Sequence, residues 1–213
     1  MSTSQTKTPV RPGILYTVSA PSGAGKTSLV RELIKSTPDI CVSISHTTRP
    51  SRPREEDGVN YHFVSKSVFD DMLQKTAFLE HALVFGNFYG TSKEWVDCAL
   101  KSGKDVILEI DWQGAQQVRK QLPNTISIFI LPPSQTSLRN RLTERGQDDQ
   151  SIIDARMAEA TEEMTHYVES DFIVINDDFE TALNEFRSII LANRLSLNQQ
   201  QITQQDLLKD LLS

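Results

Sequence analysis

The segment "SAPSGAGKTSL", residues 19–29, decides the fold expected for this chain. It matches the phosphate-loop pattern G-x-x-x-x-G-K-[ST] at every fixed position except the first, where Ala20 replaces glycine. Alanine can make the turn out of a preceding strand if its φ is negative. Gly23 and Gly25 allow positive φ and a close approach of the backbone to an anion. The segment therefore predicts an anion cradle made by Ala20, Pro21, Ser22, Gly23, Ala24, Gly25, Lys26, Thr27 and Ser28.

The surroundings of this segment agree with a phosphate loop. The apolar run "ILYTVS" (14–19) predicts a buried strand before the loop, and Thr27 to Ser36 has the apolar spacing of a helix after it. Lys26 adds a mobile positive charge, and the Thr27 hydroxyl can reach a Mg²⁺ ion. A plain glycine-serine turn between a strand and a helix is the alternative interpretation.

The remainder of the chain alternates between strand-like and helix-like patterns. Further strands are expected at 41–45, 105–111, 125–131 and 171–176, and helices at about 114–122, 134–145, 150–167 and 179–195. Such alternation predicts an α/β fold with a parallel sheet that helices cover on both faces.

Two stretches interrupt this alternation and are interpreted as insertions above the sheet edge. Residues 46–100 are polar and rich in arginine and glycine, and residues 137–157 are strongly charged. The Gln-rich tail from Ser196 onward is either a short amphipathic docking helix or a disordered end. Its leucine pairs are also compatible with a homo-oligomer.

Composition argues against several classes of protein, namely nucleic-acid-binding, membrane and disulfide-rich proteins. The 213 residues are enough for a full core, and the net charge of −6 argues against nucleic-acid binding, which favours a basic surface. No apolar run approaches the roughly 18 residues that span a bilayer, and no signal peptide is evident, so no membrane association and a cytoplasmic location are expected. The two cysteines are too few for a disulfide framework, and both are expected on buried faces.

A basic run and the end of a strand supply further candidates. Within "SHTTRPSRPREEDGVNY" (45–61), arginines three apart can clamp one phosphate bidentately, with Tyr61 close by; a solvated basic loop is the alternative. Asp111 ends the apolar strand "VILEID", which is a suitable place for an acid that holds Mg²⁺ through water, although acids are common at strand ends. Glu109 lies on the same face of that strand.

The motifs together resemble the guanylate kinase family. "SAPSGAGKTSL", "SHTTRPSRPREEDGVNYHFVS", "FLEHALVFGNFYGTS", "ILEIDWQGA" and "RLTERG" follow one another in the order and spacing of that family, over about residues 13–195. The resemblance implies the three-layer P-loop NTPase fold with a parallel sheet. It also implies an NMP-binding insertion at about 46–95 and a lid at about 137–157, and leaves a flexible N-terminal segment (1–12) and the C-terminal tail (196–213) outside.

The resemblance implies two groups of residues for GMP. Arg49, Arg52, Tyr61 and Tyr89 match the positions that hold the GMP phosphate. Ser45, Glu80 and Thr91 match those that read guanine, with Glu55, Glu109 and Asp111 in or beside the pocket. The chemistry agrees, because one carboxylate can accept from both N1–H and N2–H₂ of guanine while a hydroxyl donates to O6. A site built on such hydrogen bonds discriminates by roughly 10⁴ when they are not made.

The resemblance also assigns the ATP side. Arg141, Arg145 and Arg156 match lid arginines around the ATP phosphates, whereas Arg139 is interpreted as a surface residue. Asn176 matches a loop beside adenine. Cations brought in by closure would stabilise the charge that in-line transfer spreads over the migrating phosphoryl group.

The expected activity is transfer of the γ-phosphate of ATP to GMP. The catalytic candidates are Lys26, Arg49, Arg141, Arg145 and Arg156, with Thr27 and Asp111 serving Mg²⁺. Two alternatives remain. A guanylate-kinase-like scaffold domain would use the same pocket for a phosphorylated peptide, although such domains typically have a degraded loop. A related kinase would act on another phosphorylated acceptor and would not need Glu80.

Overall fold

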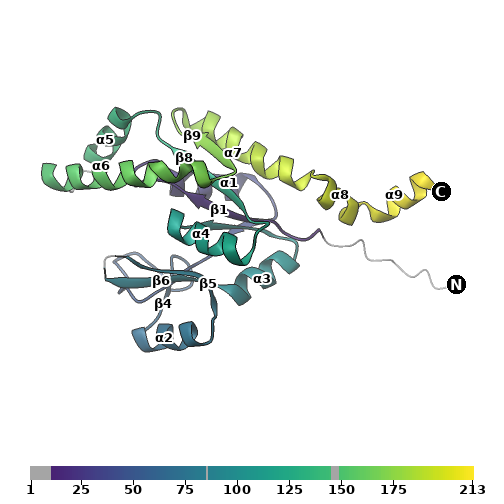
Figure 1. Cartoon of the computed structure of the whole chain (residues 1–213), viewed down its shortest axis with the longest axis horizontal. Coiled ribbons are helices and arrows are strands. Elements are labelled where there is room, and N and C mark those ends of the chain that lie inside the picture. The colour runs from purple at the N-terminus through teal and green to yellow at the C-terminus, as the bar shows by residue number, and fades with distance from the viewer. Residues whose placement is uncertain (1–10, 85, 145–148) are drawn as a thin grey trace.

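A five-stranded parallel sheet forms the centre of the molecule (Figure 1). The computed structural model describes residues 11–84, 86–144 and 149–213. The strand order is β2-β7-β1-β8-β9, and every neighbouring pair is parallel. The strands are β1 (Leu15–Ser19), β2 (Ile40–Val42), β7 (Asp105–Glu109), β8 (Ile126–Leu131) and β9 (Phe172–Ile175). The predicted α/β fold with a parallel sheet is confirmed.

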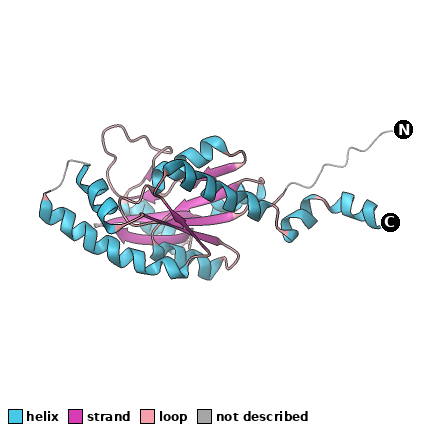
Figure 2. Ribbon diagram, turned by 90° about the horizontal axis from the view of Figure 1, so that it is seen from above, coloured by secondary structure: helices cyan, strands magenta, loops and turns pink. Residues whose placement is uncertain are grey.

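Helices cover both faces of this sheet (Figure 2). On one face, α1 (Lys26–Ser36) and α7 (Phe179–Arg194) pack over the side chains of Tyr16 and Val18. On the other face, α3 (Lys93–Lys101) and α4 (Trp112–Gln121) pack over Leu15. Neighbouring residues of β1 thus enter different clusters, because successive side chains of a strand point to opposite faces. Burial on both faces explains why these strands are near-continuous apolar runs.

A second, four-stranded sheet is built from the first insertion. Its order is β4-β3-β6-β5, with a parallel β3–β4 pair and two antiparallel pairs. A helix packs on this sheet through stacked rings: the centroid of Phe69 lies 4.5 Å from that of Phe78 and 5.4 Å from that of Phe88. The elements are β3 (His46–Thr47), β4 (His62–Phe63), α2 (Lys66–Gln74), β5 (Phe78–Val84) and β6 (Asn87–Ser92).

The charged stretch forms a helical arm. It contains α5 (Gln135–Glu144) and α6 (Gln150–Thr165), followed by the 3-10 helix η1 (His166–Glu169). The arm has a small apolar cluster of its own, in which Leu138 and Leu142 of α5 pack against Ile153, Met157 and Ala160 of α6. In Figure 1 this arm lies at the upper left, and the second sheet lies below the central sheet.

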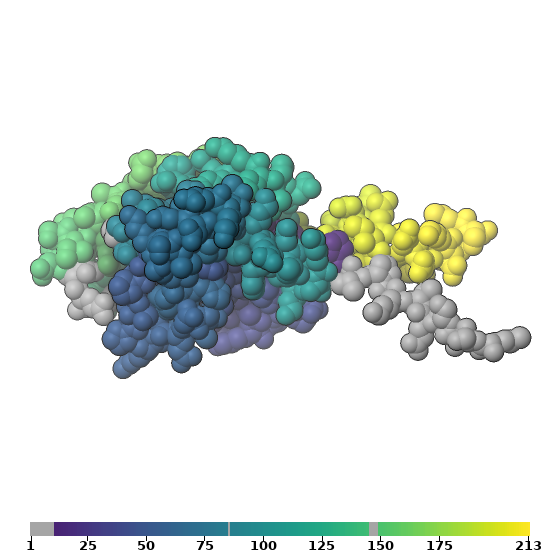
Figure 3. Space-filling model, turned by 90° about the horizontal axis from the view of Figure 1, so that it is seen from below, coloured from purple at the N-terminus to yellow at the C-terminus, as the bar shows by residue number. Residues whose placement is uncertain are grey.

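The tail is helical: its first helix is partly buried against the body, and its last helix is exposed. It forms α8 (Leu197–Thr203) and α9 (Gln205–Leu212), which project from the body in Figure 3. Every residue of α9 is exposed, so this helix packs on no other part of the described chain. One expectation is wrong: Cys41 is half-buried, but Cys98 on α3 is exposed.

Candidate active site

The candidate residues gather at one edge of the central sheet. Because β1, β7 and β9 are parallel, their carboxyl ends meet at the same edge. The phosphate loop follows β1, Asp111 follows β7, and Asn176 follows β9. Three segments that lie far apart in the sequence are therefore brought together by strand direction alone.

The phosphate loop has the backbone that its sequence predicts. Gly23 and Gly25 both have φ of 93°, a left-handed conformation that favours glycine. A Cβ atom at Gly23 would lie 2.9 Å from Leu138 of α5, and one at Gly25 would lie 2.3 Å from the side-chain nitrogen of Asn176. In the described chain, positive φ at a non-glycine residue occurs at three positions outside this loop, so Ala20 turns without a left-handed backbone.

Lys26 lies at the first turn of α1, with its charge directed into the site. Its ammonium donates to the carbonyl oxygen of Ile110 at 3.3 Å. Burial lowers the pKa of Lys26, and the nearby carboxylates Glu109, Glu163 and Asp111 oppose this shift. The Lys26 ammonium thus lies next to the cradle, where a bound phosphate would neutralise its charge.

Oxygen donors for a cation lie in the same cavity. Residues 20–23 and 25–28 of the loop line a cavity of about 350 Å³ together with Asp111 and Glu163. The Thr27 hydroxyl donates to Glu109 at 2.9 Å, and the Asp111 carboxylate accepts from the Gly114 amide at 2.7 Å. Within the described ranges no three His, Cys, Asp or Glu residues form a metal cage. Few hard oxygen donors beside a phosphate cradle suit Mg²⁺, which keeps several waters and binds substrate phosphates.

The basic run forms a compact cluster beside the second sheet. The guanidinium of Arg49 donates to both oxygens of Glu55, at 2.9 and 3.0 Å, and the Arg52 amide donates to Glu55 at 2.7 Å. The Arg49 guanidinium also lies 5.5 Å from the ring centroid of Tyr61, whose ring centroid is 5.8 Å from that of Tyr89. Two donors already converge on one carboxylate here, which is the arrangement that a phosphate needs.

Glu80 is a buried carboxyl at the back of the site. It is 4% exposed, and its oxygen accepts from the hydroxyl of Thr91, directly opposite on β6, at 2.6 Å. Burial raises the pKa of Glu80 to about 7, and the negative charge of Asp111 adds to the shift. Gly114 leaves room for this carboxylate, since a Cβ there would lie 3.2 Å from it. Ser45 follows β2 and accepts at its carbonyl from the His62 amide at 2.9 Å.

The helical arm brings arginine to the loop. Arg141 donates to the carbonyl of Asn176 at 2.8 Å and lines a second cavity with Gly23, Gly25 and Ser28. The other arginines differ in position: Arg156 is half-buried on α6, exposed Arg139 pairs with Asp154 at 2.6 Å, and Arg145 lies outside the described residues.

Comparisons with known proteins show the family to which the chain belongs. A family model described as "Guanylate kinase" matches residues 13–193. The chain belongs to the guanylate kinase family. Its relatives include guanylate kinases from Saccharophagus degradans, 66% identical over 94% of this chain and 98% of that protein, and from Pseudomonas fluorescens, 58% identical over 94% and 97%. A crystal structure of guanylate kinase from Anaplasma phagocytophilum has a TM-score of 0.73 and 30% identity, covering 90% of this chain and 91% of that one.

As a member of the guanylate kinase family, the chain is an enzyme, a nucleotide-binding kinase. Among the residues that the structure describes, no helix has the length and apolar character needed to cross a bilayer.

Two residues of this guanylate kinase site have positions that the sequence does not reveal. Asn176 is 5% exposed, and its side-chain amide donates to the Ala24 carbonyl at 2.7 Å, so it fastens the phosphate loop to the end of β9. Glu163 of α6 lines the loop cavity, although it was not a candidate. It stands in the run "ATEEMT", where nothing in the local sequence distinguishes it from Glu162.

Glu80 gives this guanylate kinase a testable pH dependence of stability. Its folded pKa of about 7 lies above the ordinary value of 4.5, so between these values the folded state binds more protons than the unfolded state. Stability is therefore greatest below about pH 4.5 as far as Glu80 is concerned, and declines as pH rises toward 7. We expect Glu80→Gln to be more stable than the parent by about 1–3 kcal/mol at pH 8 and nearly equal at pH 4.5. Urea unfolding at the two pH values measures this, and equal gains at both would contradict it.

Proposed function

We propose that this protein transfers the γ-phosphate of ATP directly to GMP, giving ADP and GDP. One observation carries the proposal: the start of α4 joins the anion cradle to the buried carboxyl Glu80. Asp111 lines the loop cavity and accepts from the Gly114 amide at 2.7 Å, and a Cβ at Gly114 would lie 3.2 Å from a Glu80 oxygen. A phosphate cradle next to a buried, hydrogen-bonding carboxyl suits a donor phosphate and an acceptor base held close together.

The group that we propose to recognise the base of the acceptor nucleotide is a buried, ionisable carboxyl. Glu80 would accept from N1–H and N2–H₂ of guanine, which adenine does not offer in the same pattern. The Thr91 hydroxyl has a single proton, which it donates to Glu80. Thr91 therefore positions the carboxylate and has no proton left to donate to guanine. Ser45 is then the hydroxyl that we assign to guanine O6. Binding of guanine would favour the ionised form of Glu80, because both new hydrogen bonds go to the charged state.

The acceptor phosphate would take the place of a carboxylate. Arg49 and the Arg52 amide converge on Glu55 in the structure. A phosphate of the same charge sign and bidentate geometry would recruit these donors, with hydroxyls from Tyr61 and Tyr89. Arg49 would then screen the repulsion between the two anionic substrates.

The donor phosphates would lie on the loop. The backbone amides and the helix N-terminus bind the phosphate chain, and the Lys26 ammonium follows the migrating group. Arg141 reaches this end of the site from α5, and we place Arg156 and Arg145 with it on closure of the arm. A bound Mg²⁺ would neutralise charge on the phosphates, with Thr27 and Asp111 as its protein-side oxygens.

The mechanism requires positioning more than covalent chemistry. The GMP phosphate oxygen is already an anionic nucleophile, so no general base is needed. We propose in-line displacement without a phosphorylated enzyme. Residues 46–95 and 137–157 would act as NMP-binding segment and lid, which approach each other and exclude water from the transferring group.

A substrate panel tests the proposal. Turnover is measured with ATP and Mg²⁺ against GMP, AMP, CMP and UMP, with a phosphorylated sugar as a further acceptor. We expect GMP to be preferred over AMP by roughly 10⁴ in kcat/KM. Comparable turnover of AMP or of the sugar phosphate would refute the assignment of Glu80 as a guanine reader.

The scaffold alternative predicts a different result. A domain that binds phosphorylated peptides would bind them in the Arg49 cluster without transferring phosphate. The complete phosphate loop, with Gly23, Gly25, Lys26 and Thr27 all present, favours the enzyme. Peptide binding without GMP turnover would favour the scaffold.

A further inference from the structure

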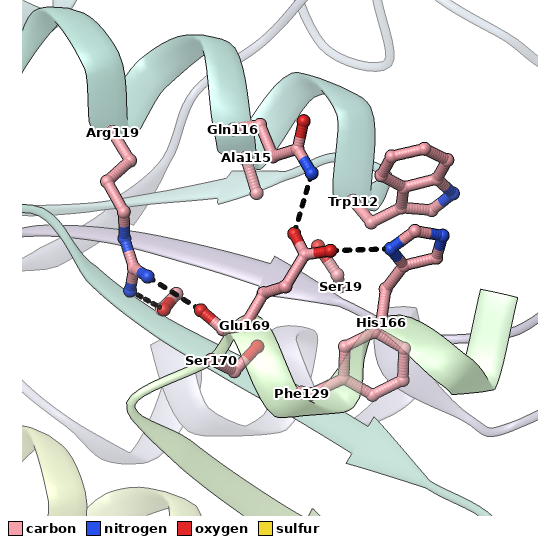
Figure 4. Close-up of a pocket in the computed structure, with 10 residues that line it drawn as sticks. Ser19, Trp112, Ala115, Gln116, Arg119, Phe129, His166, Glu169 and Ser170 are labelled. Atoms are coloured by element: carbon pink, nitrogen blue, oxygen red, sulfur yellow. Dashed lines mark hydrogen bonds and ion pairs between the residues drawn. The ribbon is translucent and has the colours of Figure 1, made fainter.

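The last turn of α6 is fastened to the core beside the loop. The ring of His166, which directly follows α6, stacks on Trp112 of α4 with centroids 3.5 Å apart and planes 8° apart. Glu169 joins the same contact, with one oxygen 2.7 Å from the His166 ring nitrogen and the other accepting from Gln116 at 2.8 Å (Figure 4). This end of the arm therefore has a defined position next to Asp111, which immediately precedes α4.

Glu163 lies on that fastened turn and reaches into the phosphate cradle. It is half-buried and lines the loop cavity of about 350 Å³ together with Ser22 and Lys26. Burial raises the pKa of Glu163. The backbone amide of Ser22 is near enough to favour the ionised carboxylate and so opposes this shift in pKa, as does Lys26. Ser22 is the third residue of the loop, so the carboxyl of Glu163 shares the cavity with one of the amides that the loop presents to an anion.

The carboxylate and a nucleotide phosphate require the same groups. Both are anions, both accept from loop amides, and both are attracted by the Lys26 ammonium. Asp111 and Glu159 are further carboxylates that face Glu163, so its charge adds to a negative potential in the cavity. A phosphate chain entering the cradle must displace Glu163 from Ser22 and overcome that potential.

We propose that Glu163 is a resident anion of the phosphate loop, which occupies the Ser22 amide and sets the affinity for ATP by competing with its phosphates. The inference rests on ATP being the donor, as proposed above. Glu163 is a positioning residue, since it acts through the loop that binds the nucleotide. It supplies a counter-charge to Lys26 and a partner for the loop amide, and both are exchanged for phosphate oxygens.

Binding of ATP without transfer tests the competition. Glu163→Gln keeps the size of the side chain and an oxygen that can accept from Ser22, but removes the charge. In EDTA and without GMP, we expect its calorimetric Kd for ATP to be about fivefold to tenfold lower than that of the parent, the effect of one nearby charge in partly solvated surroundings. Adenosine, which lacks phosphates, should bind both proteins equally.

A neighbouring residue provides the matched control. Glu162→Gln makes the same change of charge at an exposed position one residue away, and its Kd for ATP should stay within twofold of the parent. Thermal unfolding checks that each variant is folded. If Glu163→Gln does not fold, Glu163→Asp withdraws the carboxylate by one methylene, and its Kd for ATP should fall by a smaller factor.

The outcomes separate the inference from the proposed function. An unchanged or higher Kd for ATP in folded Glu163→Gln would overturn the competition, and so would an equal gain in affinity for adenosine. Failure of the parent itself to bind ATP would instead overturn the proposed function.

Discussion

Replacing Lys26 by alanine should lower kcat for GMP phosphorylation by about 10³-fold, while the protein remains folded. The ammonium lies at the cradle, where burial already lowers its pKa and the charges of three carboxylates oppose that shift. Burying this charge costs desolvation free energy in the resting protein. Its attraction to the negative charge that develops on the migrating phosphoryl group would offset that cost. Steady-state kinetics with saturating ATP and GMP measures the loss.

Lys35 is the matched control for this substitution. It lies on the same helix, is exposed, and pairs with Glu32 at 3.2 Å. Lys35→Ala should leave kcat within about twofold of the parent, because surface ion pairs contribute little. The free energy of unfolding of Lys26→Ala should stay within about 1 kcal/mol of the parent. Near-normal turnover in Lys26→Ala would contradict the role assigned to the ammonium.

Glu80→Gln should lower kcat/KM for GMP by about 10³-fold and should leave the already poor rate with AMP nearly unchanged. The parent carboxylate can accept from two guanine donors at once. In the variant, one oxygen becomes an NH₂ group that faces a guanine donor, so a hydrogen bond is lost and a donor is left buried without a partner. Competition between GMP and AMP in one assay gives the ratio directly.

The control for Glu80→Gln is an exposed acid of the same insertion, Glu56, whose change to glutamine should leave kcat/KM within about twofold. The variant also separates function from stability, because Glu80→Gln is expected to be the more stable protein at pH 8. A parallel fall in stability and activity would mean that the loss of turnover reflects unfolding and would remove the support for guanine reading.

The central sheet and the phosphate loop were predictable because their signals are local. The run 14–19 is mostly apolar, and the structure places β1 at Leu15–Ser19. The helix predicted from Thr27 begins at Lys26, and the other predicted helices end within two residues of those observed. Strand burial on both faces and helix amphipathicity each require a repeating pattern over several residues, which these segments have.

The second sheet was not predictable in this way. β3 and β4 have two residues each, too few for any alternation to appear. Their order is set by pairing of His46 with Gly90 and with His62, which lie far apart in the sequence. The sequence indicated an insertion with phosphate-binding arginines, but not the sheet that supports them.

In the candidate site, too, some features were predictable from the sequence and others depend on tertiary contacts. The residue types were readable from motifs and from resemblance to the guanylate kinase family, whereas their partners were not. Glu55 was a candidate beside the pocket, yet only the fold shows that it binds Arg49 and the Arg52 amide. Of two adjacent acids, only the packing of α6 decides that Glu163 and not Glu162 lines the loop cavity.

The amino-acid sequence alone determined the phosphate loop, the parallel α/β core and the membership of a nucleotide-kinase family, because glycine positions, apolar periodicity and motif order are properties of neighbouring residues. Tertiary structure alone decided the raised pKa of Glu80, the fastening of Asn176 to the loop and the approach of Glu163 to Ser22. These depend on burial and on contacts between distant segments, which exist only when the strand ends meet at one edge of the sheet.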